Sequence, residues 1–278
     1  MKPMSYITIA IFIFLSSFGC GDNSSSPTAE SSTTSAAAQS VPDSQPDFSR
    51  DTLSTVPNGQ RLPVDSTVAG KSTAKVRQKV EELWPTIQLK NEKGEWLNPV
   101  VTLETSLGDI ELALQPEWAP NHVRNFIALV EAGYYDGLKF DRVVRHQVQD
   151  EQGKMHPLEM IRAGCPTATG DPGIGHLGYF MTPEIRPDLK HETGTVGWWH
   201  DEDPTSGGVR FYIALAPSPL LDSQYSIVGK VQNGLKVAQE IGLGKILPLE
   251  FDPTAEQPEQ PIIIKRATWK STPPKVGQ

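Results

Sequence analysis

The chain has 278 residues, of which 21% are charged and 37% are hydrophobic, and its formal net charge is -8. This length allows one sizeable domain, or two small ones, with tails. Because phosphate binding needs a basic surface, the charge argues against nucleic acid as a partner. The 23 glycines and 24 prolines favour a loop-rich β protein over a helical bundle.

Residues 1–19 have the features of a secretory signal: Lys2 precedes an apolar run that is shorter than the ~20 residues of a membrane span. The run LSSFGC resembles the lipobox of bacterial lipoproteins, although Ser17 stands where that pattern prefers Leu. The resemblance implies cleavage before Cys20 and lipidation of Cys20; ordinary cleavage nearby is the alternative. We therefore expect an exported, membrane-anchored lipoprotein of the cell envelope that faces the periplasm or the exterior. Cys165 would then have no disulfide partner.

Two segments precede the expected globular domain. Residues 20–64 are rich in Ser, Thr, Ala and Pro and have little to bury, which predicts a disordered tether. Residues 65–98 are predicted to form a helical extension, with Val76, Val80 and Leu83 at helical spacing. Ser72 is its candidate cap, and Pro85 is expected to bend or end the helix.

The globular domain is predicted to cover residues 99–270, followed by a tail at 271–278. Two alternating strands are expected within 100–115, then an amphipathic helix within 119–135 on which His122 faces water. Short β-rich segments follow at 137–146, 159–164, 194–199, 209–216, 225–231 and 261–269, and a second helix is expected at 234–242. Many short strands with few helices indicate a closed barrel or a sandwich.

The segment GLKFDRVVRH places a permanent charge on an apolar strand face. With a period of two, Phe140, Arg142 and Val144 share one face. Two explanations stay open from the pattern alone. Arg142 could line a binding groove, or it could form a surface ion pair with Asp141 or Glu159 while its stem covers Phe140.

The order of these segments resembles that of the cyclophilin-type peptidyl-prolyl cis-trans isomerases. The resemblance covers about residues 100–269 and is carried by GYYDGLKFDRVV, the Gly-rich loop TATGDPGIG and YSIVGKVQNGLKV. It implies a mainly β fold: a closed eight-stranded antiparallel barrel with two capping helices, here preceded by the tether and the short helix. It also implies a substrate groove on the outer wall of the barrel.

The family pattern implies that Arg142 is the catalytic residue. Isomerisation of an X-Pro bond must cross a resonance barrier of roughly 18–20 kcal/mol, and a guanidinium is a fixed donor that could stabilise the twisted amide. By their places in the motifs, the substrate-binding residues would be Phe140, Met160, Arg162, Arg210, Tyr212, Leu221 and Tyr225. Alternation puts Arg210 and Tyr212 on one strand face and Phe211 on the other. Ordinary core packing is the alternative role for the apolar members.

The chain departs from the family pattern at several groove positions. Glu159 replaces a pocket Phe, Arg162 and Arg210 each replace a Gln, and Leu220 replaces a pocket Trp. Three arginines close together would repel one another, so we expect nearby carboxylates to neutralise them; the candidates are Glu159, Asp201 and Asp203. These changes leave open whether the site has been adapted to other substrates or has lost activity.

We therefore expect an isomerase that assists the folding of exported proteins. The alternative is a catalytically weak or inactive cyclophilin-like module that binds Pro-containing segments. The expected partners are Pro-containing polypeptides and, through the lipid, a membrane; we expect a monomer, no nucleic acid, no cofactor and no metal. The run WWHDEDP could suggest metal ligands and Cys165 a nucleophile, but no motif supplies the further residues that either site needs.

Overall fold

The computed structural model describes residues 45–150, 152–249 and 252–272. The predicted signal, Cys20, the first part of the tether and most of the tail lie outside these residues. No helix among those described is long and apolar enough to cross a membrane.

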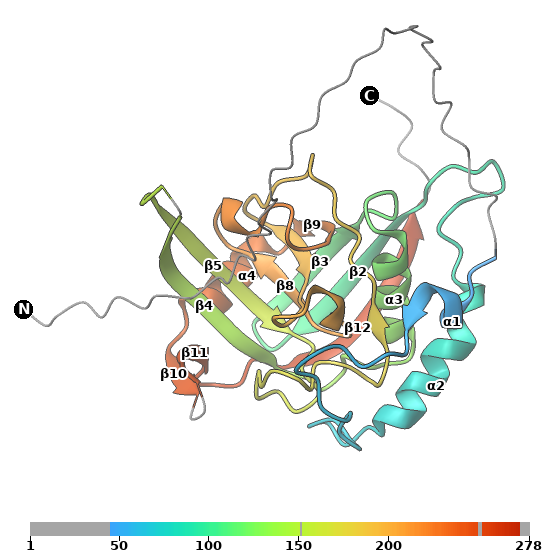
Figure 1. Cartoon of the computed structure of the whole chain (residues 1–278), viewed down its shortest axis with the longest axis horizontal. Helices are drawn as coiled ribbons and strands as arrows, with labels where there is room; N and C mark the ends of the chain where they lie inside the picture. Colours follow the sequence, from blue (N-terminus) through green and yellow to red (C-terminus); the bar gives the residue numbers. More distant parts are fainter. Residues whose placement is uncertain (1–44, 151, 250–251, 273–278) are drawn as a thin grey trace, which may run out of the picture. The chain divides into compact units, whose positions relative to one another are not determined.

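One large antiparallel sheet forms most of the domain (Figure 1). Its strand order is β10-β11-β4-β5-β8-β7-β9-β3-β2-β12, and every pairing between neighbours is antiparallel. The strands are β2 (Asn98–Thr105), β3 (Gly108–Leu114), β4 (Phe140–Gln149), β5 (Met155–Ala163), β7 (Thr195–Trp198), β8 (Phe211–Ala214), β9 (Ile227–Asn233), β10 (Ile246–Leu249), β11 (Asp252–Pro258) and β12 (Ile264–Thr272). A separate two-stranded sheet pairs β1 (Thr52–Leu53) with β6 (Phe180–Met181).

The mainly β fold with few helices is confirmed, but the prediction of a closed eight-stranded barrel is wrong. The described sheet has ten strands, and no ladder joins its two ends. The start of β4 meets the segment before β12 only through the isolated bridge between Lys139 and Ile263 and nearby backbone bonds. The edge of β4 is instead taken at Val143 by Glu256 of β11. The additional β10–β11 hairpin thus occupies the edge that closure with β12 would need.

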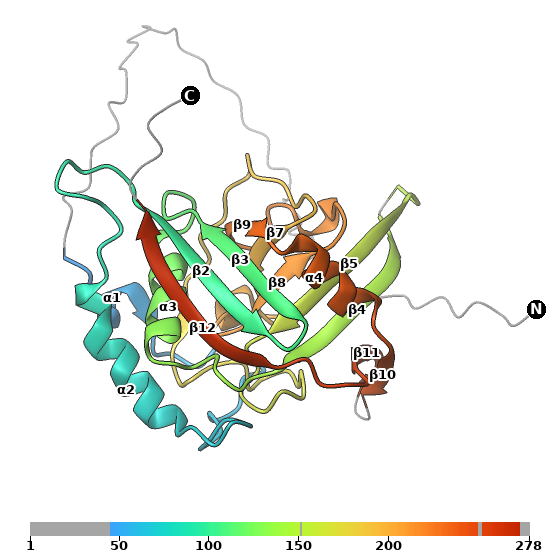
Figure 2. The same ribbon diagram turned by 180° about the vertical axis from the view of Figure 1, so that it is seen from behind.

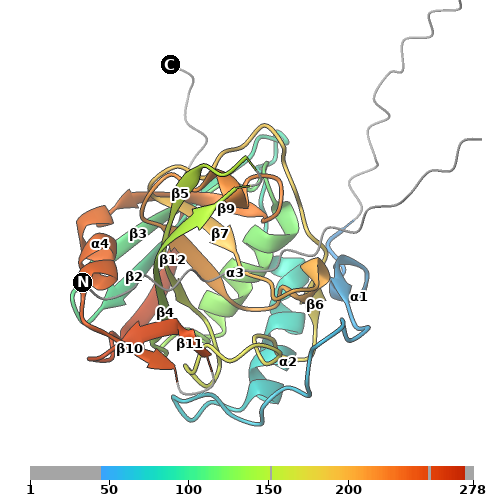
Figure 3. The same cartoon turned by 60° about the vertical axis from the view of Figure 1, so that its left-hand side comes forward.

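Two helices cover the sheet at separate places, as expected. Helix α3 (Pro120–Glu131) turns its apolar side inward, where the ring of Phe126 lies 5.0 Å from that of Phe211 and 5.7 Å from that of Trp198. Helix α4 (Leu235–Leu243) buries Ala238 and Ile241 in the same core. Figures 2 and 3 both show β2 and β3 between the two helices. Short 3₁₀ turns are η1 (Trp84–Thr86), η2 (Pro204–Ser206) and η3 (Pro219–Leu221).

His122 does not face water as predicted. Its side chain is 2% exposed, and Nδ1 lies 2.6 Å from a carboxylate oxygen of Glu184. The same carboxylate accepts hydrogen bonds from the backbone N–H groups of Asn121 and His122 at the start of α3. The periodicity of α3 could not reveal this contact, because Glu184 comes from a distant loop that covers the helix N-terminus.

The N-terminal extension packs against the domain. Helix α2 (Thr73–Leu83), capped by Ser72, lies beside α3, which separates it from the strands in Figures 1 and 2. The described part of the predicted tether, residues 45–64, is ordered: it contains α1 (Phe48–Asp51) and β1. The Phe48 ring contacts those of Trp84 and Tyr179, at 5.4 and 4.9 Å between centroids. This aromatic contact holds the described part of the predicted tether against the domain.

Candidate active site

The candidate site lies on the outer face of β4, β5, β8 and β7, where one row of residues crosses all four strands. Arg142 is paired with Arg162, Arg162 with Tyr212, and Tyr212 with Gly197. Directly paired residues of adjacent antiparallel strands point to the same side of a sheet. The register therefore places Arg142, Arg162 and Tyr212 on one surface. The next row on that face contains Val144, paired with Met160.

A β-bulge changes one of the predicted contacts. The register of β4 and β5 shifts between Phe140 and Arg142, so Asp141 is an extra residue in the ladder. Phe140 consequently points into the main core together with Val143, and it does not share the outer face with Arg142 and Val144. The assignment of Phe140 to the substrate-binding face is wrong for this reason. The alternation predicted for β8 is confirmed: Phe211 lies in the main core and Tyr212 on the outer side.

The four apolar pocket residues carried over from the family pattern meet in one cluster that is separate from the main core. Met160, Tyr212 and Leu221 pack there with Val144, and Tyr225 packs against them. Met160, Tyr212 and Leu221 are each 7% exposed or less. They therefore form the floor of the site, and the half-buried side chains above them form its accessible surface. We call this group, together with Leu158 and Trp199, the outer cluster.

Trp199 is the main member of the outer cluster that sequence analysis missed. Its ring stacks on that of Tyr225 at 5.4 Å and meets that of Tyr212 edge-on at 6.2 Å. The signal was available in the sequence: adjacent residues of a strand point to opposite faces, so only one of Trp198 and Trp199 could enter the core. Trp198 does so, and Trp199 is left on the face that bears Tyr212.

The electrostatic surroundings of Tyr225 include the three arginines of the site. Burial raises the pKa of Tyr225 to about 12, and the negative charge of Asp201 acts in the same direction. The positive charges of Arg162, Arg210 and Arg142 oppose this rise in the pKa. Arg142 itself is half-buried.

Arg162 is held in a buried ion pair behind this surface. Its Nε donates to Asp141 at 2.9 Å, and its Nη2 donates to the Gly170 carbonyl at 2.9 Å. The other oxygen of Asp141 accepts from the backbone N–H of Cys165 at 2.9 Å. The guanidinium also lies over the Trp199 ring, 5.0 Å from its centroid, and supports that ring from one side.

Arg210, which is buried, is held in a second ion pair with a partly buried carboxylate, beneath the Gly-rich loop. Its Nη2 donates to Asp201 at 2.5 Å, and its guanidinium packs so closely against Gly175 that a methyl group there would overlap it. Burial works against ionisation of Asp201, but the Arg210 charge and bonds from Gly173 N–H and Gln60 hold its pKa well below the usual range. Gln60 belongs to the described part of the predicted tether, which therefore borders the site.

These pairs correct two predictions about charge. Arg162 and Arg210 were expected to touch substrate, but each is 1% exposed and engaged by a carboxylate. The expected neutralising role of Asp201 is found, whereas the partner of Arg162 is Asp141. Glu159 is paired across the strands with Arg145, and Asp203 caps η2. The sequence named Asp201 among the candidate carboxylates but could not assign a partner to each arginine, because each pair joins segments brought together only by the fold.

Two other candidate chemistries in the sequence are used structurally. The ring nitrogens of His200 lie 2.6 Å from the Asp201 carbonyl and 3.1 Å from the Gln224 carbonyl, and its ring stacks on Tyr225. The Asp201 carboxylate is engaged by Arg210. Cys165 is a buried thiol whose Sγ lies 3.4 Å from the Thr167 hydroxyl.

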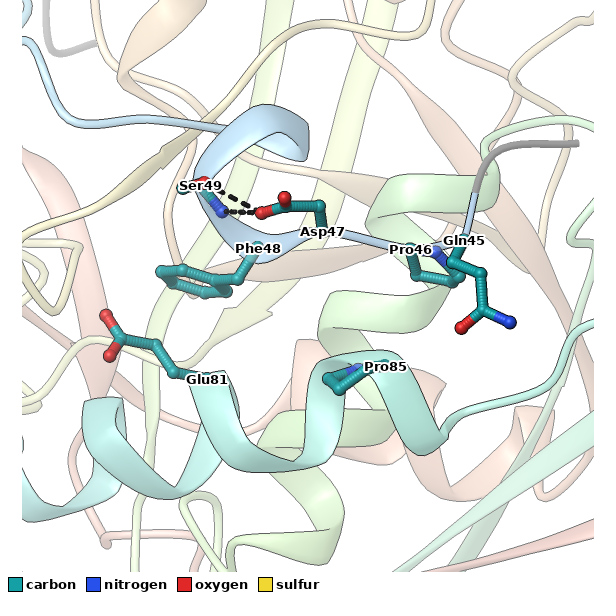
Figure 4. Close-up of a pocket in the computed structure, with 7 residues that line it drawn as sticks. All are labelled: Gln45, Pro46, Asp47, Phe48, Ser49, Glu81 and Pro85. Carbon is teal, nitrogen blue, oxygen red and sulfur yellow. Dashed lines mark hydrogen bonds between the residues drawn. The ribbon is translucent and has the colours of Figure 1, made fainter. Parts of the chain in front are cut away.

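A hollow of about 510 Å³ lies elsewhere, between α1 and the end of α2 (Figure 4). It is lined by Gln45, Pro46, Asp47, Phe48, Ser49, Glu81 and Pro85. Asp47 is engaged there in capping α1 through Ser49, as the dashed lines in Figure 4 show. The hollow contains none of the predicted site residues. The candidate site is therefore located by the register of the four strands and not by this hollow.

Comparisons with known proteins give a consistent result. Residues 100–269 match the family model described as cyclophilin type peptidyl-prolyl cis-trans isomerase. The chain is 36% identical over 145 residues to peptidyl-prolyl cis-trans isomerase-like 1 of Aspergillus fumigatus, covering 52% of this chain and 83% of that protein. It is 35% identical over 167 residues to peptidyl-prolyl cis-trans isomerase ppi1 of Schizosaccharomyces pombe, covering 60% and 96%.

A solved structure agrees with the fold. A cyclophilin type peptidyl-prolyl cis-trans isomerase of Cryptosporidium parvum, crystallised in the presence of the dipeptide Ala-Pro, aligns with a TM-score of 0.50 and 26% identity. The alignment covers 62% of this chain and 99% of that one. The extension and the tail lie outside the family match, which ends at residue 269.

Proposed function

The chain belongs to the cyclophilin-type peptidyl-prolyl cis-trans isomerase family, and we propose that it accelerates rotation about X-Pro bonds with Arg142 as the electrostatic catalyst. One observation carries the proposal most directly. Arg142 stands in register with Arg162 and Tyr212 on the outer face, in the row next to Val144 and Met160 of the outer cluster. A cation beside an apolar surface is what a proline-bond isomerase requires.

The chemistry involves no covalent step. Rotation breaks the amide resonance and returns lone-pair character to the prolyl nitrogen. A donor that contacts this nitrogen, or the adjacent carbonyl, binds the twisted amide better than the planar one and so lowers the barrier. Arginine suits this role because it stays protonated and presents fixed donors. An adjoining apolar surface excludes water and strengthens the interaction.

Arg142 differs in its exposure from the two other arginines of the site. Arg162 and Arg210 are nearly inaccessible; Arg162 donates to the buried Asp141, and Arg210 donates to the partly buried Asp201. Their charges are thereby balanced behind the surface, so that they do not compete for substrate. Arg142 is the half-buried guanidinium of the same row. We assign contact with the proline ring to the accessible parts of Trp199 and Tyr225, above the floor formed by Met160, Tyr212 and Leu221.

The test is an isomerisation assay on a proline-containing peptide. We expect Arg142→Ala to reduce kcat/KM by about 100-fold, the typical cost of removing one preorganised donor. Arg145→Ala is the matched control, because Arg145 lies on the same strand and bonds the Gly244 carbonyl away from the row. Equal rates for the wild type and Arg142→Ala would exclude Arg142 as the catalyst. A wild-type rate equal to the uncatalysed rate, with peptide binding retained, would leave a binding module only.

We further propose that the enzyme acts as a monomer on exported polypeptides while anchored to a membrane through Cys20. The support is the signal-like N-terminus with its lipobox-like ending. Labelling of cells with a radioactive fatty acid tests this directly. The wild-type chain should take up label and Cys20→Ser should not. Equal labelling of both chains, or of neither, would contradict the anchor without affecting the assignment of Arg142.

A further inference from the structure

Tyr212 carries a polar group into the most deeply buried part of the outer cluster. Its side chain is fully buried between Met160, Leu221 and the aromatic rings above them. A buried hydroxyl without a partner would cost about 1–3 kcal/mol, so its partner matters. That partner is Nε2 of His191, at 2.7 Å from the hydroxyl oxygen.

His191 is itself fixed by a carboxylate. Its Nδ1 lies 3.0 Å from Oδ1 of Asp222, and its backbone N–H donates to the same oxygen at 2.8 Å. The other Asp222 oxygen forms an ion pair with Lys190 at 3.3 Å. An ionised carboxylate can only accept, so Nδ1 carries the hydrogen and a neutral ring presents Nε2 as the acceptor. The Tyr212 hydroxyl therefore donates to His191, in the order Tyr212–His191–Asp222.

Gly197 gives the Tyr212 ring the space to reach this histidine. It is the direct cross-strand partner of Tyr212, and a methyl group at Gly197 would overlap the hydroxyl end of the ring. The tyrosine thus folds across β7 in the space left by the missing side chain. Three separate contacts define the position of one ring: the glycine beneath it, the histidine at its tip and the cluster around it.

From this geometry we infer that His191 and Asp222 are positioning residues, which act through the Tyr212 hydroxyl to fix the floor of the proline-binding surface. The inference rests on the proposed function, since it assigns the floor to substrate binding. It goes further in naming two residues outside the predicted site. Neither residue touches the substrate. Their effect is that the floor is rigid when the proline ring arrives, so that binding does not have to order it.

The test separates the two nitrogens of His191 with two substitutions. The Asn side chain of His191→Asn retains a donor near Nδ1 but has nothing at Nε2. The longer Gln of His191→Gln places an acceptor near Nε2. We expect His191→Asn to raise KM about three- to tenfold, the range of one net hydrogen bond, with kcat changed less than twofold. His191→Gln should restore KM to within about twofold of the wild type.

The matched control is His122→Asn. His122 is also 2% exposed and also bonds a carboxylate through Nδ1, but it lies at the start of α3 and does not contact Tyr212. The substitution His122→Asn should lower the free energy of unfolding as His191→Asn does and leave KM unchanged. Tyr212→Phe preserves the ring and should raise KM as His191→Asn does. Combining Tyr212→Phe with His191→Asn should raise KM no further, because the shared hydrogen bond is already lost.

Several outcomes would overturn the inference. An unchanged KM in His191→Asn, accompanied by a loss of stability equal to that of His122→Asn, would reduce the histidine to a structural role. If His191→Asn does not fold, Tyr212→Phe gives the answer alone, and an unchanged KM in that variant refutes the inference. Multiplicative effects in the double variant would show that His191 does not act through the hydroxyl. Failure of the proposed function is distinct, because the wild type itself would then show no catalysis.

Discussion

Replacing Asp141 by Asn should be the most damaging conservative change at the site. Asp141 is fully buried, and its two oxygens accept from Arg162 Nε and from Cys165 N–H, each at 2.9 Å. Asn is almost the same size, so the change creates little cavity. It removes the charge and leaves the Arg162 guanidinium buried without its counter-ion.

The expected cost follows from the burial of the pair. Removing one partner of a buried ion pair typically destabilises by about 3–5 kcal/mol, against a total stability of about 5–15 kcal/mol for a domain. An exposed pair has little such effect. Arg266 and Glu104 bond at 2.6 Å on the surface, and Glu104→Gln should cost less than about 1 kcal/mol. This pair is therefore the matched control.

Equilibrium urea unfolding at pH 7 measures the difference. Asp141→Asn should lower the free energy of unfolding by several times as much as Glu104→Gln. Adding Arg162→Met to Asp141→Asn should recover part of the loss, because the unpaired charge is then gone. If Asp141→Asn costs no more than Glu104→Gln, the claim that this pair balances the charge behind the outer face is refuted.

Two further predictions concern Gly197 and the buried histidines. Gly197→Ala should push the Tyr212 ring aside, lower the free energy of unfolding by about 1–3 kcal/mol, as overpacking does, and raise KM. A KM and a urea midpoint equal to those of the wild type would contradict the packing described. Burial lowers the pKa of both His176 and His191, so the unfolded chain binds protons first as the pH falls. Their contribution to stability should be complete above about pH 6.5 and decrease below it, and a urea midpoint that rises from pH 7 to pH 5.5 would refute this.

The sequence by itself determined the local elements and the face each strand presents. The 3.6-residue period identified α3, and the period of two separated Phe211 from Tyr212, because both patterns depend on neighbouring residues alone. The resemblance of the motifs to the family pattern was also sufficient to predict that Met160, Tyr212, Leu221 and Tyr225 lie in one group. The strand pattern of Arg142 left a groove and a surface ion pair open, and only the family resemblance favoured the groove; its catalytic role stays a prediction.

Only the tertiary structure decided how those elements close and which charges meet. The bulge at Asp141 moves Phe140 into the core, and the β10–β11 hairpin takes the edge of β4; both depend on pairing with a distant strand. The partners of Arg162 and Tyr212 lie 21 residues away in each case. A sequence states which groups need partners once buried, but burial and proximity arise only when separate segments pack, so the partners themselves are chosen by the fold.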